Sequence, residues 1–450
     1  MTAVRALGAA ALAAAAATAL AACSAGQQAR PAGLAGQQPG SARPASSSPA
    51  GPASGQAVPA SGQAAPGRGG KAGQAPGPGR LPRYPSGAAV TRCSTRTGRA
   101  PVLRDVPAAA ERVPEPPFGV AAASSGYSFV TMGTGGTLAA GSVAVFRDGG
   151  TGQPAQLRRL SAGPLPQGVA LTRGGRYLLV ATGSGITVIS ARRAELGRPR
   201  AVLGALTSSG SGAIEVAVTP DGSLAFVSLE GSSEIAVFDL RQALASHFVR
   251  SGYIGSIPAG FAPVGLALSP DGRWLYATSE QSAGGSSAGL LQVISVAAAR
   301  IRPAAATVAV VRAGCEPVRV ITSADGRVVW VTARASNELL GFSASRLRSS
   351  PARSLAAAVR VGELPVGVAL ADGGRRLVIA DSDRFDIPGG HASLAVVNVP
   401  AALSGRAALA GYLSSGRFPR ELALEPGGRK LLVTNYGSRQ LQEVRVTGLP

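Results

Sequence analysis

From Pro117 onward, the sequence alternates short apolar runs with turns rich in Gly, Pro and Asp. In the clearest stretch, Pro263-Val-Gly-Leu-Ala-Leu-Ser-Pro-Asp-Gly-Arg-Trp-Leu-Tyr-Ala-Thr278, one apolar run precedes a Ser-Pro-Asp-Gly turn and another follows it. Such runs are typical of β-strands, and the Gly supplies the positive φ that a tight hairpin needs. A third run (291–296) and a fourth (306–311) follow before the next Pro. The pattern therefore predicts four antiparallel strands in chain order.

This pattern occurs seven times along the chain. The copies begin at residues 117, 166, 213, 263, 317, 365 and 419, so that successive copies are 47 to 54 residues apart. Four antiparallel strands repeated at about this period are typical of a β-propeller. We therefore predict an all-β fold, a seven-bladed β-propeller of four-stranded antiparallel blades over residues 100–450. The last copy ends after its third strand, so we expect a strand within 100–113 to complete the seventh blade and close the ring.

Two segments carry a family resemblance. SPDGRWLYATS (269–279) and GGRKLLVTNYGSRQLQEVRV (427–446) resemble the YVTN-type β-propeller repeat, which is related to the propellers of the lactonase superfamily. The resemblance covers roughly residues 100–447 and implies the propeller fold. In the lactonase relatives, a His, Glu and Arg constellation across several blades acts on a sugar or organic-acid lactone. No His occupies the innermost motif positions here, so the resemblance assigns no catalytic residue to this chain.

The first 23 residues have the features of an export signal. Arg5 is followed by an apolar stretch (6–19) that is too short for a good membrane span. The sequence Leu20-Ala-Ala-Cys23 resembles the lipobox of bacterial lipoproteins. The resemblance implies that residues 1–22 are a removed signal peptide, that Cys23 is lipidated, and that the protein is extracytoplasmic and anchored to the cell membrane. The alternative is an ordinary secretory signal in which Cys23 is incidental.

Residues 23–99 consist mainly of Ala, Gly, Pro, Ser and Gln. Such a segment cannot bury enough apolar surface to offset the entropy of ordering the chain, so we expect a disordered tether. Its length would hold the propeller away from the bilayer or carry it through a cell-wall layer. An electrostatic arm that binds anionic lipid or wall polymer is the alternative.

The formal net charge of +21 raises the question of nucleic-acid binding. Only two of the 44 basic residues are Lys, which indicates a compositional preference for Arg rather than a designed basic face. The first 105 residues hold eleven basic residues against Asp105 alone, so about half of the charge precedes the predicted propeller. No aromatic residues interleave with these Arg residues as stacking platforms, so the sequence gives no strong nucleic-acid signal.

The third position of each copy, two residues after its start, should point towards the central channel. This position holds Gly119, Gly168, Glu215, Gly265, Arg319, Gly367 and Glu421, and Arg420 is adjacent to the last. Charges are rare in this chain, so three at equivalent positions are candidates for a ligand-binding site. A water-filled channel with a satisfied Glu–Arg network is the alternative.

A loop on the same predicted face concentrates polar residues, namely Asp381, Asp383, Asp386 and His391. Three carboxylates can bind Ca²⁺, but the spacing of an EF-hand and its distal Glu are absent, so we expect no metal and no cofactor. Export would place Cys93 and Cys315 in an oxidising compartment, where they can form a disulfide. Two separate thiols are the alternative.

These features predict a surface-anchored, monomeric propeller that acts as a non-enzymatic binding or scaffolding module in the cell envelope. Its partner would be an envelope protein or a small ligand on the propeller face, and the lipid anchor would bind it to the membrane. The alternative is a lactonase-like hydrolase that uses Glu215, Arg319 and Glu421.

Overall fold

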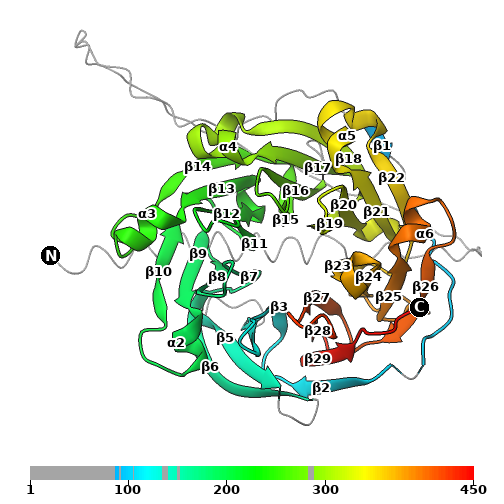
Figure 1. The fold of residues 1–450 in the computed structure, drawn as a ribbon, viewed down its shortest axis with the longest axis horizontal. Coiled ribbons are helices and arrows are strands. Elements are labelled where there is room, and N and C mark those ends of the chain that lie inside the picture. Colours follow the sequence, from blue (N-terminus) through cyan, green and yellow to red (C-terminus); the bar gives the residue numbers. More distant parts are fainter. Residues whose placement is uncertain (1–86, 91–92, 105, 134–139, 149–152, 282–287) are drawn as a thin grey trace, which may run out of the picture.

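The computed structural model describes residues 87–90, 93–104, 106–133, 140–148, 153–281 and 288–450. The expected signal peptide, Cys23 and most of the expected tether lie outside these residues. Seven sheets surround a common axis, which confirms the predicted seven-bladed propeller (Figure 1). In each blade the first strand lies nearest the axis and the fourth lies at the rim.

The blades follow one another around the ring in chain order. Blades 1 and 2 contain β3 (Pro117–Ala122), β4 (Tyr127–Met132), β5 (Ala140–Asp148) and β6 (Pro154–Pro164), then β7 (Val169–Leu171), β8 (Tyr177–Thr182), β9 (Gly185–Ser190) and β10 (Val202–Thr207). Blades 3 and 4 contain β11 (Ala213–Val218), β12 (Leu224–Leu229), β13 (Glu234–Asp239) and β14 (Tyr253–Pro258), then β15 (Phe261–Leu268), β16 (Trp274–Gln281), β17 (Ala288–Ser295) and β18 (Thr307–Cys315). Blades 5 and 6 contain β19 (Pro317–Thr322), β20 (Val328–Ala333), β21 (Glu338–Ser343) and β22 (Leu355–Arg360), then β23 (Pro365–Ala371), β24 (Arg376–Asp381), β25 (Ser393–Asn398) and β26 (Leu409–Ser414). Blade 7 contains β27 (Pro419–Leu424), β28 (Lys430–Asn435), β29 (Gln440–Arg445) and the N-terminal β2 (Ala108–Arg112).

The two faces of the ring differ in the connections that they carry. The first strand of a blade begins where its second strand ends, as shown by the pairing of Pro365 with Asp381. The connections between blades and the loops between second and third strands therefore lie on one face, which we call the entry face. The hairpin turns between first and second strands lie on the opposite face. There, Gly222 and Gly272 of the Pro-Asp-Gly turns have φ of 66° and 69°, as the turn chemistry requires.

The ring is closed by the N-terminal strand. β2 lies within the segment expected to do so, and it pairs antiparallel with β29, with Ala108 opposite Val444 and Arg112 opposite Gln440. The first residues of the propeller thus complete its last blade, and unpaired edges are avoided at this junction.

Before it reaches β2, the N-terminal segment follows the rim from blade 4 to blade 7 (Figure 1). We call residues 87–107 the belt. β1 (Gly87–Val90) adds a parallel fifth strand to blade 4 beside β18. Gly98 N donates to Val361 O of blade 5 at 2.8 Å, and Leu103 N donates to Tyr412 O of blade 6 at 2.7 Å. The belt is therefore bonded to each blade that it passes.

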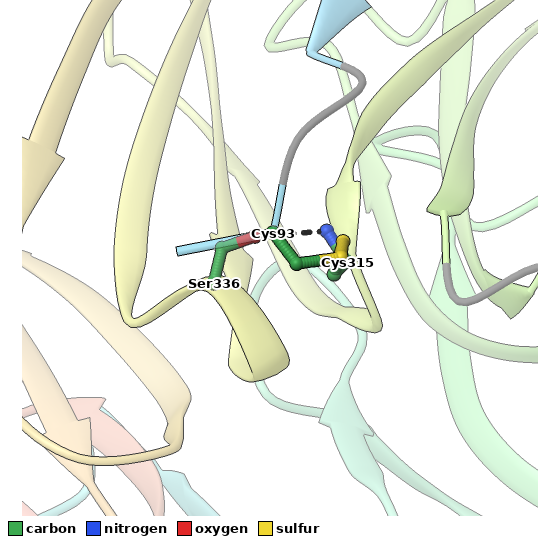
Figure 2. The surroundings of a disulfide bond; sticks show 3 residues. All are labelled: Cys93, Cys315 and Ser336. Atoms are coloured by element: carbon green, nitrogen blue, oxygen red, sulfur yellow. Dashed lines mark hydrogen bonds between the residues drawn. A yellow bond between two sulfur atoms is a disulfide. The ribbon is translucent and has the colours of Figure 1, made fainter. Parts of the chain in front are cut away.

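A disulfide between Cys93 and Cys315 fixes the belt to the end of β18 (Figure 2). The Cα atoms of the two residues are 5.4 Å apart, and 222 residues separate them in sequence. Cys315 is fully buried, and its backbone N–H donates to Ser336 Oγ of blade 5 at 3.0 Å. The covalent link therefore lies at the junction of blades 4 and 5.

Side-chain hydroxyls of the second strands connect neighbouring blades. In blade 4, Thr278 Oγ1 accepts from Gly265 N at 3.0 Å and donates to Val318 O of blade 5 at 2.7 Å. Thr434 Oγ1 likewise donates to Phe118 O at 2.8 Å and so joins blade 7 to blade 1. The same bridge is made by Thr131, Ser228 and Thr332. These hydroxyls satisfy backbone groups that the sheets themselves leave unpaired.

Five short helices follow the third strands of blades 2 to 6. They are α2 (Ala191–Glu195), α3 (Leu240–Ala245), α4 (Val296–Ile301), α5 (Ala344–Ser349) and α6 (Val399–Leu403). A Ser, Asp or Asn side chain at the end of the strand caps each one, as when Asp239 Oδ1 accepts from Gln242 N at 2.8 Å. No helix within the described part of the chain is both long and apolar enough to cross a membrane.

Candidate functional site

The second motif position of each blade lines the axis. Phe118, Ile214, Val264, Val318 and Val366 come from five different blades and form one buried apolar cluster. Residues from five blades can touch one another only at the axis. The equivalent residues of blades 2 and 7 are Gln167 and Arg420. The axis is therefore closed by a mostly apolar ring that contains one cation.

Three charged residues at the third motif position meet beside this ring. Arg319 Nε donates to Glu421 Oε1 at 2.7 Å and lies 3.4 Å from Glu215 Oε2. Its Nη2 also contacts Glu421 Oε1, and its Nη1 lies 3.4 Å from Val264 O. Blades 3, 5 and 7 supply these three residues, so the predicted candidates Glu215, Arg319 and Glu421 are in contact. One guanidinium group thus contacts two carboxyl groups.

Burial sets the protonation of this triad. The side chains of Arg319, Glu215 and Glu421 are 6%, 15% and 15% exposed. Burial raises the pKa of the Glu215 carboxyl to about 8, an effect that Arg319 opposes and the neighbouring Glu421 reinforces. At neutral pH Glu215 therefore retains its proton, and Arg319 forms its charge-assisted bond with Glu421.

A second ionic cluster lies on the entry face, at and after the ends of second strands and in the connection into blade 5. Arg334 Nη1 is 3.0 Å from Glu280 Oε1, and Arg334 Nη2 is 2.8 Å from Glu316 Oε2. Glu230, after β12, also belongs to this cluster, since burial and then Glu280 raise its pKa while several Arg residues oppose the shift. Arg334, like Arg319, thus contacts two glutamate side chains. These residues were not among the candidates predicted from the sequence, although Glu230, Glu280 and Arg334 occupy the same position in three successive copies of the repeat.

Arg384 and Arg420 are held by aromatic rings instead. The Arg420 guanidinium lies 3.6 Å from the centroid of Phe118 and 5.5 Å from that of Phe418. The Arg384 guanidinium also lies 5.5 Å from the centroid of Phe418. The Phe418 ring in turn packs against Tyr436, with 5.1 Å between the ring centroids. Burial and then Arg319 and Arg384 lower the pKa of Arg420 to about 9, and burial and then Arg334 lower the pKa of Arg384. Among the described residues, neither guanidinium has a carboxylate within ion-pair distance.

A cavity of ≈ 350 Å³ opens beside Arg384, between the blade 6 loop and the start of blade 7. Its lining includes Asp383, Arg384, Asp386, His391, Arg417 and Phe418. Asp383 Oδ1 accepts from Ile387 N at 3.0 Å, so this carboxylate stabilises the loop. Asp386 and His391 are exposed at the margin. The structure thus places three of the four predicted loop residues around one cavity.

Asp381, the fourth loop candidate, lies apart from this cavity in the interior of blade 6. It is fully buried and accepts from Ser393 Oγ at 3.2 Å. Burial raises the pKa of Asp381 well above its usual range, although the bonds from Ser393 and from backbone N–H groups oppose the shift. Within the described ranges, no three His, Cys, Asp or Glu side chains gather as a metal-binding set.

Comparison with known proteins agrees with this geometry. A chain of "Kuenenia stuttgartiensis Hydrazine Synthase" is 18% identical, with a TM-score of 0.58 over 76% of this chain and 98% of that one. A chain from "Crystal Structure of Mitotic Checkpoint Complex" is 12% identical, with a TM-score of 0.56 over 81% of this chain and 97% of that one. At these identities the likeness concerns the fold alone. No curated protein matches the sequence.

The family comparison is more specific. Residues 107–387 match the family described as "Lactonase, 7-bladed beta-propeller", which covers more than half of the chain. The matched segment begins immediately before the ring-closing β2 and ends in the blade 6 loop. Together with the seven blades, this match shows that the chain belongs to the seven-bladed β-propeller lactonase family.

Proposed function

We propose that this protein is an extracytoplasmic propeller, tethered to the membrane through lipidated Cys23, that binds a ligand or partner at its entry face without catalysing a reaction. The observation that carries the proposal is the triad of Glu215, Arg319 and Glu421. Arg319 engages both carboxyl groups, and its side chain is only 6% exposed. Groups that satisfy one another in this way hold the blades together and are poorly placed to exchange protons with a substrate.

The placement of the two histidines supports this proposal. General acid–base catalysis requires a titratable group within hydrogen-bond reach of the reacting atom. His247 follows α3 on the opposite face and is exposed, whereas His391 lies at the margin of the blade 6 cavity. Neither belongs to the axial apolar cluster or to the triad.

Hydrolysis of simple lactones tests the absence of catalysis. We expect purified protein to leave δ-gluconolactone and γ-butyrolactone at their uncatalysed rates, and Glu215→Gln and Glu421→Gln to change nothing. The half-buried Glu111→Gln in β2 is a matched control. Lactone turnover that is lost in the two axial variants and kept in Glu111→Gln would contradict the proposal.

Membrane fractionation tests the location independently. In bacterial cells we expect the wild-type protein in the membrane fraction with a labelled fatty acid attached, and Cys23→Ala without the label and released from the membrane. An unlabelled wild-type protein in the soluble fraction would contradict the lipid anchor.

One observation favours the alternative of a lactonase-like hydrolase. The pKa of Glu215 is raised to about 8, so this carboxyl group carries a proton at neutral pH, as a general acid must. A hydrolase that uses Glu215 in this role would lose activity as the pH rises through about 8 and would be inactive as Glu215→Gln.

A further inference from the structure

The cavity between blades 6 and 7 has the size of a small-molecule site. Its volume of ≈ 350 Å³ lies near the lower end of the range for ligand pockets, about 300–1,000 Å³. One wall is the loop after β24, which contributes Arg384, and the other is the connection into β27, which contributes Arg417 and Phe418. The cavity opens on the entry face, the face at which the proposed function places binding.

Arg384, which lines this cavity, differs from the buried Arg319 and Arg334 in its partners. Arg319 and Arg334 each contact two glutamates. Arg384 is half-buried and has no carboxylate within 4.0 Å among the described residues. Glu230, Glu280 and Glu316 act on it only from a greater distance, and the charge of Arg334 opposes them. A buried charge is costly unless an opposite charge or hydrogen bonds compensate for it. This part of the site therefore favours an added anion.

The aromatic rings determine how these guanidinium groups are presented. Arg384 packs over Phe385 at 5.0 Å and over Phe418 at 5.5 Å from the ring centroids. A guanidinium that stacks by its face keeps its N–H groups at the edge, where they can bond the two oxygens of a planar anion. Arg417, at the same cavity, uses Nη2 to donate to Gly437 O at 3.2 Å and has further N–H groups.

The acidic groups of the cavity limit the charge of its occupant. Asp383 is only 8% exposed and accepts from Ile387 N, whereas Asp386 is exposed at the margin. Two carboxylates near the arginines would repel a dianion such as phosphate more strongly than a monoanion. Planar, singly charged carboxylates also match the arginine fork in a bidentate manner.

We propose that the cavity between blades 6 and 7 binds a small organic carboxylate, which Arg384 and Arg417 hold by its charged group. The inference rests on the proposed binding function and specifies the ligand class of the entry face. Aromatic Phe418 contributes an apolar wall beside the charged group, so a benzoate-like body fits better than acetate.

Titration with four probes tests this assignment: sodium benzoate, sodium acetate, neutral benzamide and sodium phosphate. Binding is followed by calorimetry on the full chain, with ionic strength held constant by chloride because the chain is strongly basic. We expect saturable binding of one benzoate per chain, weaker binding of acetate, and none of benzamide or phosphate. Arg384→Met preserves the packing against the rings but removes the charge, and it should weaken benzoate binding about ten-fold or more.

Two further variants make the test decisive. Arg417→Met changes an exposed side chain of the same cavity and should weaken benzoate binding without altering the melting temperature. It therefore tests the assignment even if Arg384→Met does not fold. Arg375→Met removes an exposed arginine from the opposite face of blade 6 and should bind benzoate like the wild type. The assignment is overturned if neither benzoate nor acetate binds saturably, if phosphate binds in their place, or if benzoate affinity is the same in both cavity variants as in the wild type. None of these results bears on the lactone and fractionation tests, so the proposed function is tested independently of the ligand class.

Discussion

The hydroxyl bridges between blades make a specific prediction about stability. Thr278 is the clearest case because both of its backbone partners, Gly265 N in its own blade and Val318 O in the next, are buried. Substituting Thr278→Val keeps the branched shape of the side chain but removes the hydroxyl group. The N–H and the C=O then lose their shared partner at the junction of blades 4 and 5.

The expected loss follows from two orphaned groups. A buried donor or acceptor without a partner costs about 1–3 kcal/mol, and the added methyl group of Val returns about 0.8 kcal/mol of apolar burial. We therefore expect Thr278→Val to lower the free energy of unfolding by about 1–5 kcal/mol. This is a large share of the roughly 5–15 kcal/mol typical of a folded domain.

Guanidinium unfolding of the oxidised protein, followed by tryptophan fluorescence, measures this change. Trp274 and Trp330 lie in the second strands of blades 4 and 5, on both sides of the altered junction. The matched control is Thr207→Val, since Thr207 is exposed at the end of the outermost strand β10. The reasoning is refuted if Thr278→Val has the same midpoint and slope as the control.

Three other predictions concern the belt, the axis and the helices. Removing the disulfide with Cys93→Ser opens a loop of 222 residues in the unfolded chain, and chain entropy sets the expected loss at about 5 kcal/mol, measured as a lower denaturant midpoint. Between about pH 4.5 and 8, the folded state keeps a proton on Glu215 that the unfolded state has lost. The contribution of this group to the free energy of unfolding therefore declines as the pH rises through that window, by up to about 1.4 kcal/mol per pH unit. Melting curves of Glu215→Gln should lack this dependence on pH. Asp239→Ala removes the cap from Gln242 N and should cost about 1 kcal/mol, measured by the same unfolding assay.

Each of these predictions has an outcome that contradicts it. A Cys93→Ser variant whose midpoint equals that of the oxidised wild type would show that the belt contributes no restraint. Glu215→Gln with the pH slope of the wild type would place the titrating group elsewhere, and Glu111→Gln is the control for a half-exposed carboxylate. An unchanged midpoint for Asp239→Ala would show that the α3 cap is dispensable.

Much of the fold could be predicted because its signals are local. The apolar runs, the Pro-Asp-Gly turns and their regular period specify hairpins, and the missing fourth strand of the last copy indicates closure by β2. The capped helices were missed because each is only five or six residues long, although a Ser, Asp or Asn precedes every one of them. The belt was missed because backbone hydrogen bonds such as that from Gly98 N to Val361 O hold it, and these have no side-chain signature.

The candidate site could also be predicted only in part from the sequence. The motif register alone indicated that Glu215, Arg319 and Glu421 occupy equivalent positions, and the structure places them in contact. The register could not show that Arg384 and Arg420 share the Phe418 ring while Arg334 is paired with glutamates.

The sequence by itself thus determined the number of blades and the strands within each blade, because strand pairing within a repeat depends on neighbouring residues. It placed the third motif position at the axis, whereas the structure places the second position there. Only the tertiary structure decided which charges meet across the ring, such as Arg319 with Glu421 from two blades further on, and which guanidinium groups pack against aromatic rings instead, such as Arg420 against Phe118. The reason is physical: these contacts depend on how seven separate sheets pack around one axis, and no local segment contains that information.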